Sequence, residues 1–238
     1  MFLSLDTSTL TLSLALAERT ADGDLRIVEQ VAHRPPRKQS ELLPGSIGEL
    51  LVRHGLAVRD LEGIAIGLGP GSFTGLRIGL ATAKAIAYAM RIKLAGVSSL
   101  AAVALEGSEE VLLIPTAIAR RGELYIGRYR RQGIAIEKCG LEEAVTPAQL
   151  AEILAKTKDA VALGPAMEEY GEQLRSLGVP AQRVSAGPTF PSAASVASLA
   201  QFPSEFQANA VFELEPHYVR ASAAEENPAF RSIPERIG

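Results

Sequence analysis

A glycine-rich segment between a short apolar strand and a long apolar helix is the feature that most limits how this chain can fold. Ile64–Ile66 is the strand, Gly67–Gly75 holds four glycines and a proline, and Leu76–Met90 shows helical periodicity. A strand, a turn and a helix in this order are typical of α/β folds. Glycines also allow backbone N–H groups to converge at the helix N-terminus, where an anion can bind.

The ligand of this loop is not fixed by its sequence. No Lys-Ser or Lys-Thr pair follows Gly75, so the loop is not a P-loop, and Ser72 stands where a dinucleotide-binding loop has its third glycine. A structural turn is therefore favoured over a phosphate site. If phosphate binds here, the candidate residues lie in this loop and in the polar turn after the first strand: Asp6, Thr7, Ser8, Gly69, Gly71 and Ser72.

The helix Leu76–Met90 has more apolar surface than one sheet can cover. At about 100° per residue, Arg77, Lys84 and Arg91 fall on one narrow stripe, and apolar residues cover roughly 240° of the circumference. A helix on one sheet needs an apolar arc of only a little over about 100°. The rest must be covered by the chain's own second lobe or by another protein.

Three predicted strands followed by helices occur twice, which indicates two lobes of similar build. We expect residues 1–105 to form the first lobe, 106–214 the second, and 215–238 to pack back on the first lobe. The first lobe has predicted strands Phe2–Leu5, Leu10–Ala17 and Leu25–Ala32, and a helix Glu41–His54 with Ser40 as its N-cap. The second has predicted strands Val111–Ile118, Glu123–Arg131 and Ile134–Lys138, and helices near Pro147–Lys156, Met167–Leu177 and Ser192–Phe202.

Residues suited to catalysis or to metal binding are scarce. Between Gly63 and Leu105 the sequence has no Asp, Glu or His, so general acid–base chemistry has no candidate there. Asp6 could hold Mg²⁺ through water, but a lone carboxylate in a tight turn is more often a turn former. We therefore assign no catalytic residue and no metal site. The three histidines lack metal-ligand spacing and are expected at the surface or at an interface: His33, His54 and His217.

Charge and composition argue against several partners. The net charge of −3 gives no overall attraction to a phosphate backbone, and no apolar run approaches the length of about 18 residues that indicates a membrane span. The single Cys139 cannot form an internal disulfide, and no basic leader precedes the first apolar run, so we expect a cytoplasmic protein. Near Tyr125 and Tyr129 lies a basic cluster, for which a charged strand edge is favoured over an RNA contact: Arg120, Arg121, Arg128, Arg130 and Arg131.

Five motifs, in matching order and spacing over nearly the whole chain, resemble the bacterial TsaB (YeaZ) family. The most specific is the run G-P-G-S-F-T-G-L-R-I-G, which begins at Gly69. The five are L-x-x-D-T-S-T at Leu3–Thr9, G-L-G-P-G-S-F-T-G-L-R-I-G at Gly67–Gly79, G-V-S-S-L at Gly96–Leu100, A-R-R-G-E-L-Y at Ala119–Tyr125 and P-H-Y-V-R at Pro216–Arg220.

The resemblance implies a fold and a function. Such proteins have the two-lobed actin-like ATPase fold (ASKHA superfamily, ribonuclease H-like), an α/β fold with mixed sheets flanked by helices. The implied role is that of a non-catalytic scaffold or dimerisation partner of the TsaD-like transferase that makes N6-threonylcarbamoyladenosine in tRNA, together with a TsaE-like ATPase. The resemblance also implies a homodimer when the chain is alone, and tRNA contact only through the complex. No cofactor of its own is expected, with ATP or ADP and Mg at the partner interface as an option.

The alternative is an enzyme that acts alone, either a small ASKHA-type ATPase or phosphotransferase, or a glycoprotease-like peptidase. Two departures from the family pattern weigh against it. Neither Lys38 nor Gln39 is the histidine that many relatives have at this point, and Ala119 stands where relatives have an acid. Without that acid Asp6 has no partner carboxylate, so independent ATP hydrolysis is less expected. The resemblance places the partner interface on two first-lobe helices, at Leu43, Ile47, Leu76, Ile78, Leu80, Ala83, Ala87 and Met90.

Overall fold

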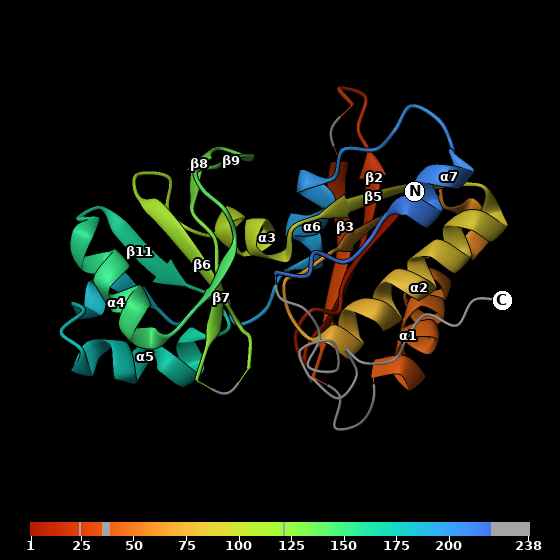
Figure 1. The fold of residues 1–238 in the computed structure, drawn as a ribbon. Coiled ribbons are helices and arrows are strands. Elements are labelled where there is room, and N and C mark those ends of the chain that lie inside the picture. Colours follow the sequence, from red (N-terminus) through yellow and green to blue (C-terminus); the bar gives the residue numbers. More distant parts are fainter. Residues whose placement is uncertain (24, 35–38, 121, 220–238) are drawn as a thin grey trace, which may run out of the picture.

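The computed structural model describes residues 1–23, 25–34, 39–120 and 122–219, with the side chains of 39–41 excepted. It has two lobes, each built on its own sheet (Figure 1). The first lobe has a five-stranded sheet in the order β3-β2-β1-β4-β5, in which β2 is antiparallel to both β1 and β3, while β4 and β5 run parallel to β1. Its strands are β1 (Phe2–Asp6), β2 (Leu12–Arg19), β3 (Leu25–His33), β4 (Gly63–Gly67) and β5 (Lys93–Val97).

Helices cover both faces of the first-lobe sheet. α1 (Gln39–Arg53) and α2 (Phe73–Met90) pack on the face where Leu3 and Leu5 of β1 enter the largest core cluster. α3 (Ser99–Leu105) and α6 (Ala193–Leu199) lie on the other side, between this sheet and the second lobe (Figure 1). Side chains of a strand alternate between its two faces, so Leu3 and Leu5 pack under α1 and α2, while Phe2 and Ser4 contact α6.

Local sequence sets the ends of the first two helices. The Oγ of Ser72 accepts a hydrogen bond of 3.2 Å from the N–H of Gly75, so α2 begins at Phe73, three residues before the predicted start. α1 begins earlier than predicted, so Ser40 lies inside the helix instead of capping it. Gly55 follows α1 with a φ of +67°, a left-handed conformation that glycine adopts without strain.

The second lobe has a seven-stranded sheet in the order β10-β7-β6-β11-β12, with β8 paired to β6 and β9. The predicted strand Glu123–Arg131 is in fact two strands with a break at Gly127 and Arg128: both pair antiparallel with β6, but the neighbour on the other side changes from β10 to β9. The elements are β6 (Leu112–Ile118), β7 (Leu124–Ile126), β8 (Tyr129–Gln132), β9 (Ala135–Lys138), β10 (Glu143–Val145), α4 (Pro147–Lys156), β11 (Ala160–Leu163), α5 (Met167–Ser176) and β12 (Val184–Ser185).

The chain returns to the first lobe earlier than the expected boundary at residue 215. α6 packs on β1, β2 and β4, and α7 (Ala208–Glu213) packs on α2. Two buried hydrogen bonds fix the start of α6: Ser4 Oγ donates to the carbonyl of Ala193 at 2.6 Å, and the N–H of Ala193 donates to Ser13 Oγ at 2.9 Å. Val211 of α7 joins the first-lobe core. Residues from about Ser192 onward therefore belong with residues 1–105, and the predicted tail beyond residue 219 lies outside the described residues.

The predicted two-lobed α/β architecture with mixed sheets flanked by helices is confirmed. Among the described helices, none is both long enough and apolar enough to cross a membrane.

Candidate functional site

The glycine loop and the turn after β1 fit tightly against each other. A Cβ atom on Gly67 would lie 1.8 Å from Asp6 Oδ2, and one on Gly71 would lie 2.2 Å from the carbonyl oxygen of Ser8. The N–H of Ser72 donates to that same carbonyl at 2.7 Å. Glycine is required at these positions because another part of the protein, and not a ligand, occupies the space beside the backbone.

Asp6 lies at the centre of this contact and is completely buried. Its Oδ1 accepts hydrogen bonds from the N–H and the Oγ of Ser8, at 2.8 and 2.6 Å, and its Oδ2 accepts one of 2.6 Å from Ser99 Oγ. Burial raises the pKa of Asp6, while the hydrogen bonds from Ser8 and Ser99 act in the opposite direction. Both carboxylate oxygens are thus engaged by donors of the protein itself.

Thr7 links the same turn to α2. Its Oγ1 donates a hydrogen bond of 2.8 Å to the carbonyl of Gly75 in the first turn of the helix. One turn later, a Cβ on Gly79 would lie 2.2 Å from Thr7 Oγ1, so a glycine is needed for the close approach. The six predicted phosphate-site residues are therefore brought together, but five of them bond to each other or to the ends of α2 and α3, and Gly71 packs against Ser8. The arrangement does not fit a bound nucleotide phosphate; it anchors α2 to the sheet.

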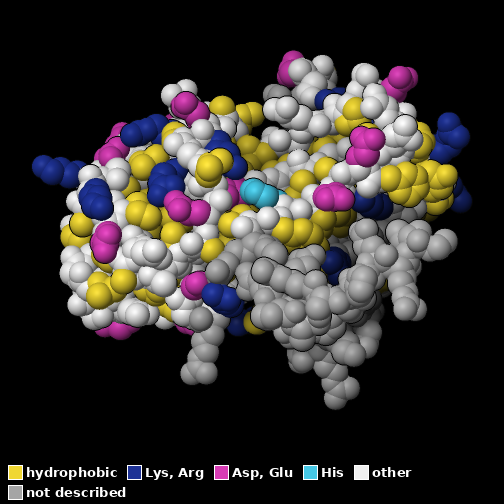
Figure 2. Space-filling view, in the orientation of Figure 1, with side chains coloured by type: hydrophobic (Ala, Val, Ile, Leu, Met, Phe, Trp, Pro, Cys, Tyr) yellow, Lys and Arg dark blue, Asp and Glu magenta, His cyan; other side chains and the backbone are white. Residues whose placement is uncertain are grey.

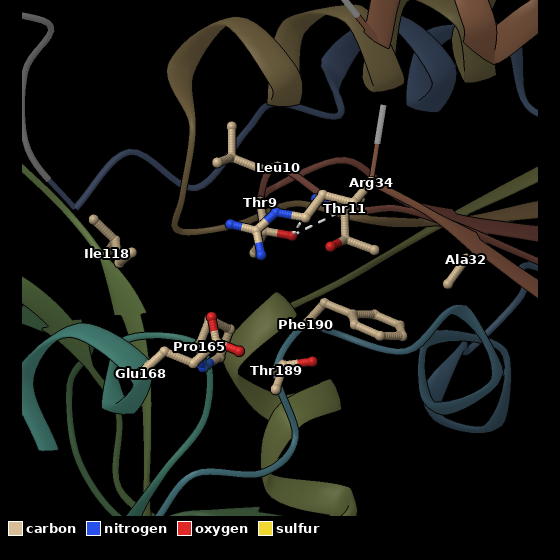
Figure 3. A pocket seen from close by; sticks show the side chains of 10 residues that line it. All are labelled: Thr9, Leu10, Thr11, Ala32, Arg34, Ile118, Pro165, Glu168, Thr189 and Phe190. Atoms are coloured by element: carbon tan, nitrogen blue, oxygen red, sulfur yellow. Dashed lines mark hydrogen bonds between the residues drawn. The ribbon is translucent and has the colours of Figure 1, made fainter. Parts of the chain in front are cut away.

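A cleft of about 280 Å³ opens between the lobes close to this turn (Figure 3). Thr9 and Leu10 line it from the first lobe, and Ile118 and Glu168 line it from the second. Its volume is just below the range of about 300–1,000 Å³ found for small-molecule sites. Asp6 is not among the side chains that line it, so the cleft and the buried carboxylate do not form one site.

Most of the predicted partner-interface residues lie in the first-lobe core. Six of them are each at most 5% exposed: Leu43, Ile47, Leu76, Leu80, Ala83 and Ala87. Leu76 packs against Gly69 of the glycine loop, and the other five belong to the core cluster between the sheet and the helices α1 and α2. The sheet, α1 and α7 together cover the wide apolar arc of α2. These six residues therefore cannot contact a partner, and the prediction is corrected for them. Of the eight, only Ile78, half-buried, and Met90, 41% exposed, reach the surface.

A different side of α2 is exposed. Four small residues follow one line along the outer face of this helix, and we call them the outer stripe: Thr74, Ala81, Ala85 and Ala89. Beside it, Tyr88 is 51% exposed and stacks on Phe212 of α7, which is 59% exposed, with ring centroids 5.0 Å apart. Figure 2 shows hydrophobic side chains at the edge of the first lobe, where α7 lies in Figure 1.

The basic cluster of the second lobe is paired with acids. Arg128 Nη1 lies 2.7 Å from Glu143 Oε1, and Arg130 Nη2 lies 3.0 Å from Asp159 Oδ2. Arg120 and Arg131 are paired in the same way, with Glu123 and Glu109. Arg121 lies outside the described residues. This pairing supports the interpretation of a charged strand edge over that of an RNA-contacting surface.

Sequence reasoning missed one polar cluster at the junction of the lobes. Glu142, in the loop before β10, has a side chain that is 0% exposed. It accepts hydrogen bonds from Ser98 Oγ, at 2.6 Å, and from the hydroxyl of Tyr129. His217, which the sequence predicts at the surface or an interface, places Nδ1 2.7 Å from Glu142 Oε2. The only signal in the sequence is that His217 lies in one of the five family motifs, Pro216–Arg220.

Comparisons with known proteins agree on one family. Residues 28–229 match the family model described as "TsaD: tRNA N6-adenosine threonylcarbamoyltransferase". The chain is 34% identical over 158 residues to the tRNA threonylcarbamoyladenosine biosynthesis protein TsaB of Bacillus subtilis, covering 66% of each chain. It is 33% identical over 135 residues to TsaB of Escherichia coli, covering 54% of each. The matched segments thus span less than two thirds of either relative.

Two solved structures from Pseudomonas aeruginosa have the same fold. One is described as an uncharacterized protein with similarity to peptidase YeaZ; it superposes with a TM-score of 0.71 at 25% identity, covering 92% of this chain and 99% of that chain. The other is YeaZ, with a TM-score of 0.66 at 27% identity, covering 83% of this chain and 89% of that chain. The likeness therefore extends over both lobes.

Proposed function

Because the chain belongs to the TsaB (YeaZ) family, we propose that it acts in the biosynthesis of N6-threonylcarbamoyladenosine in tRNA as the non-catalytic partner of a TsaD-like transferase. In this role it supplies a binding surface, and the transferase supplies the reacting groups. The same fold supports enzymes and scaffolds alike, so the proposal rests on the site and not on the architecture.

The closed contact between the glycine loop and the turn after β1 carries the proposal. A phosphate on this loop would need free backbone N–H groups, but those of Gly69 and Ser72 already donate to Ser99 Oγ and to the Ser8 carbonyl. A metal on Asp6 would have to replace the donors Ser8 and Ser99 in a fully buried site. What the motif does in this chain is to hold the N-terminal end of α2 in a fixed position, which is what a helix used for recognition requires.

The outer stripe is the proposed contact with the transferase. Small side chains let a partner helix approach closely, and interhelical distance depends on the side chains at the contact. The TsaD family model matches residues 28–229 of this chain, so the transferase is expected to share the fold and to offer a similar pair of helices. We propose a pseudo-symmetric pairing of these helices that buries about 800 Å² per partner, with a second copy of the chain as the occupant when the transferase is absent.

Further partners follow from the same proposal. A TsaE-like ATPase joins the assembly, and any ATP or ADP with Mg binds at the partner interface, with this chain lending contacts from its surface. The paired arginines of the second lobe leave tRNA binding to the complex as a whole. The assembly works in the cytoplasm, where its tRNA substrate is made.

A reconstituted modification assay tests the proposal. The TsaD-like and TsaE-like proteins of the same organism are supplied with tRNA, threonylcarbamoyl donor and ATP, with and without this chain. We expect modification only when the chain is present, and we expect the chain alone to hydrolyse neither ATP nor a peptide. Equal modification without the chain would contradict the proposal. ATP hydrolysis by the chain alone that is lost in Asp6→Ala would support the rival enzyme.

A further inference from the structure

Glu142 is a buried carboxylate that the second lobe presents to the first. Its Oε1 accepts hydrogen bonds from Tyr129, in its own lobe, and from Ser98, the N-cap of α3. Its Oε2 accepts no hydrogen bond from any described residue. Among the described residues, the group placed against Oε2 is Nδ1 of His217, at 2.7 Å, a contact that is an ion pair when the imidazole is protonated.

His217 belongs to a short segment, Glu215–Tyr218, that we call the strap. The strap lies on the first lobe, where the N–H of His217 donates a hydrogen bond of 2.8 Å to the carbonyl of Leu68, at the start of the glycine loop. One residue further, the hydroxyl of Tyr218 accepts a hydrogen bond of 3.1 Å from Arg77 Nε. The Tyr218 ring also packs on Phe73, with centroids 5.2 Å apart.

These contacts place the strap between two sites. At one end it meets the buried carboxylate of the second lobe, and at the other it covers the first turn of α2. Tyr218 is 40% exposed there and packs on Phe73, the residue that precedes Thr74 of the outer stripe. The strap has no secondary structure of its own, so individual contacts hold it: those of His217 with Leu68 and Glu142, and those of Tyr218 with the start of α2.

We propose that Glu142 is a positioning residue: by holding His217 it fixes the strap on α2, so that Tyr218 and Phe73 extend the surface that the transferase binds. This inference rests on the proposed function for the identity of the partner. It assigns to the second lobe a part in partner binding that requires no contact between that lobe and the partner.

The burial of Glu142 explains why its contact with His217 can hold the strap. A carboxylate removed from water is stable only when charge or hydrogen bonds compensate it. Lys138 Nζ lies 3.8 Å from Glu142 Oε1, the oxygen that already accepts hydrogen bonds from Ser98 and Tyr129. In the part of the chain that the structure describes, His217 is the group in contact with Oε2, so displacing the strap would remove that contact from a buried oxygen. The free-energy cost of a buried oxygen without a contact therefore favours the conformation in which the strap stays in place.

Hydrogen exchange of the strap, measured on the full chain by mass spectrometry, tests the positioning role. We expect Glu142→Gln and His217→Ala each to raise the exchange rate of the His217 amide by about tenfold or more, while strands β1 and β4 exchange as in the wild type. The double variant should exchange no faster than His217→Ala, because the two residues act through one contact. The matched control is Glu143→Gln, which removes a neighbouring carboxylate that is 45% exposed and paired with Arg128.

Partner binding is measured on the same variants by titration calorimetry with the TsaD-like protein. Glu142→Gln and His217→Ala should weaken binding by roughly fivefold to tenfold, and Glu143→Gln should not. Unchanged strap exchange in Glu142→Gln, or an equal change in Glu143→Gln, would overturn the positioning role. A loosened strap with unchanged partner affinity would overturn the link to the interface. Failure of the wild-type chain to bind the transferase would instead refute the proposed function, and the exchange rates would still decide whether Glu142 holds the strap.

Discussion

Ser99 Oγ donates a hydrogen bond of 2.6 Å to Asp6 Oδ2 and accepts one of 3.0 Å from the N–H of Gly69. One hydroxyl thus joins the end of β1, the glycine loop and the start of α3. It stands between the buried carboxylate and the glycine loop. Three of the family motifs, those that contain Asp6, Gly69 and Ser99, therefore supply the residues of one internal hydrogen-bond network.

Removing this hydroxyl should destabilise the first lobe. Ser99→Ala leaves both Asp6 Oδ2 and the N–H of Gly69 without their partner in a buried site, which costs about 1–3 kcal/mol for each group left unsatisfied. Urea denaturation measures the loss. Ser198→Ala is the control, because the Ser198 hydroxyl bonds to the carbonyl of Ala194 on an exposed helix surface. Equal stability of the two variants would show that the network does not hold the loop.

The buried Asp6 should give the protein a pH-dependent stability. Its pKa in the folded state is raised from the ordinary value of 3.8, mainly because burial disfavours the charged form. Between the ordinary and the raised pKa, the folded protein binds more protons at Asp6 than the unfolded chain does. The contribution of Asp6 to the free energy of unfolding is therefore fully present at low pH, and it is lost as the pH rises through the raised pKa.

The isosteric variant Asp6→Asn isolates this contribution, since other groups titrate alike in both proteins. The free energy of unfolding of the wild type minus that of Asp6→Asn should increase as the pH is lowered from about 7 toward about 4. Urea titrations at several pH values measure this difference. A difference that is constant, or that decreases toward acid, would mean that the carboxylate is not held in a desolvated site.

Gly71 should not tolerate a side chain. In Gly71→Ala the new methyl group would meet the Ser8 carbonyl at 2.2 Å, and a backbone atom cannot move aside easily. We expect a loss of about 3 kcal/mol in the free energy of unfolding, as for an overpacked core. Gly45→Ala is the control, because nothing lies within 4 Å of a Cβ there, and alanine should stabilise α1 by about 0.5–1 kcal/mol. Thermal unfolding of the two variants shows whether they shift in opposite directions.

The isolated chain should bind tRNA weakly. The arginines of the second-lobe edge are paired with acids, and the net charge is −3, so only nonspecific binding with a dissociation constant of roughly 10⁻⁴–10⁻⁶ M is expected at physiological salt. Filter-binding titrations at two salt concentrations measure it. Tight, salt-sensitive binding by the chain alone would show that it recognises tRNA without its partner.

The sequence predicts the local elements of this protein well because they depend on nearby residues. The alternation of Leu12, Leu14 and Leu16 places β2, and glycine at Gly55 ends α1, as the structure confirms. The strand–loop–helix unit around Gly67–Gly75 is found where it is predicted. The break between β7 and β8 is missed because it lies where the neighbouring strand changes from β10 to β9, a change of pairing that the sequence does not reveal.

The exposed face of α2 could not be predicted, because it depends on distant segments. The apolar arc of this helix suggested an uncovered surface, yet α7, which is more than a hundred residues away in the sequence, packs on it and α1 covers another side. Leu80 therefore lies in the core and Ala85 lies outside. The pairing of Glu142 with His217 was missed for the same reason, since each residue alone has no distinctive context.

The central claim, that this chain works by presenting the outer face of α2 to a TsaD-like transferase, is tested most directly by the affinity of Ala85→Arg for that protein. Arginine and alanine have similar helix propensities and this position is exposed, so the variant should unfold within about 0.5 kcal/mol of the wild type. Leu80→Ala, at a position 5% exposed, should instead lose about 2–5 kcal/mol of stability.

Titration calorimetry compares Ala85→Arg with the matched control Ala155→Arg, which adds the same charge to an exposed position on α4 of the second lobe. We expect the wild type and Ala155→Arg to bind the transferase equally well and Ala85→Arg to bind at least about a hundredfold more weakly, because a charge buried without a partner costs several kcal/mol. Wild-type affinity in Ala85→Arg would contradict the account.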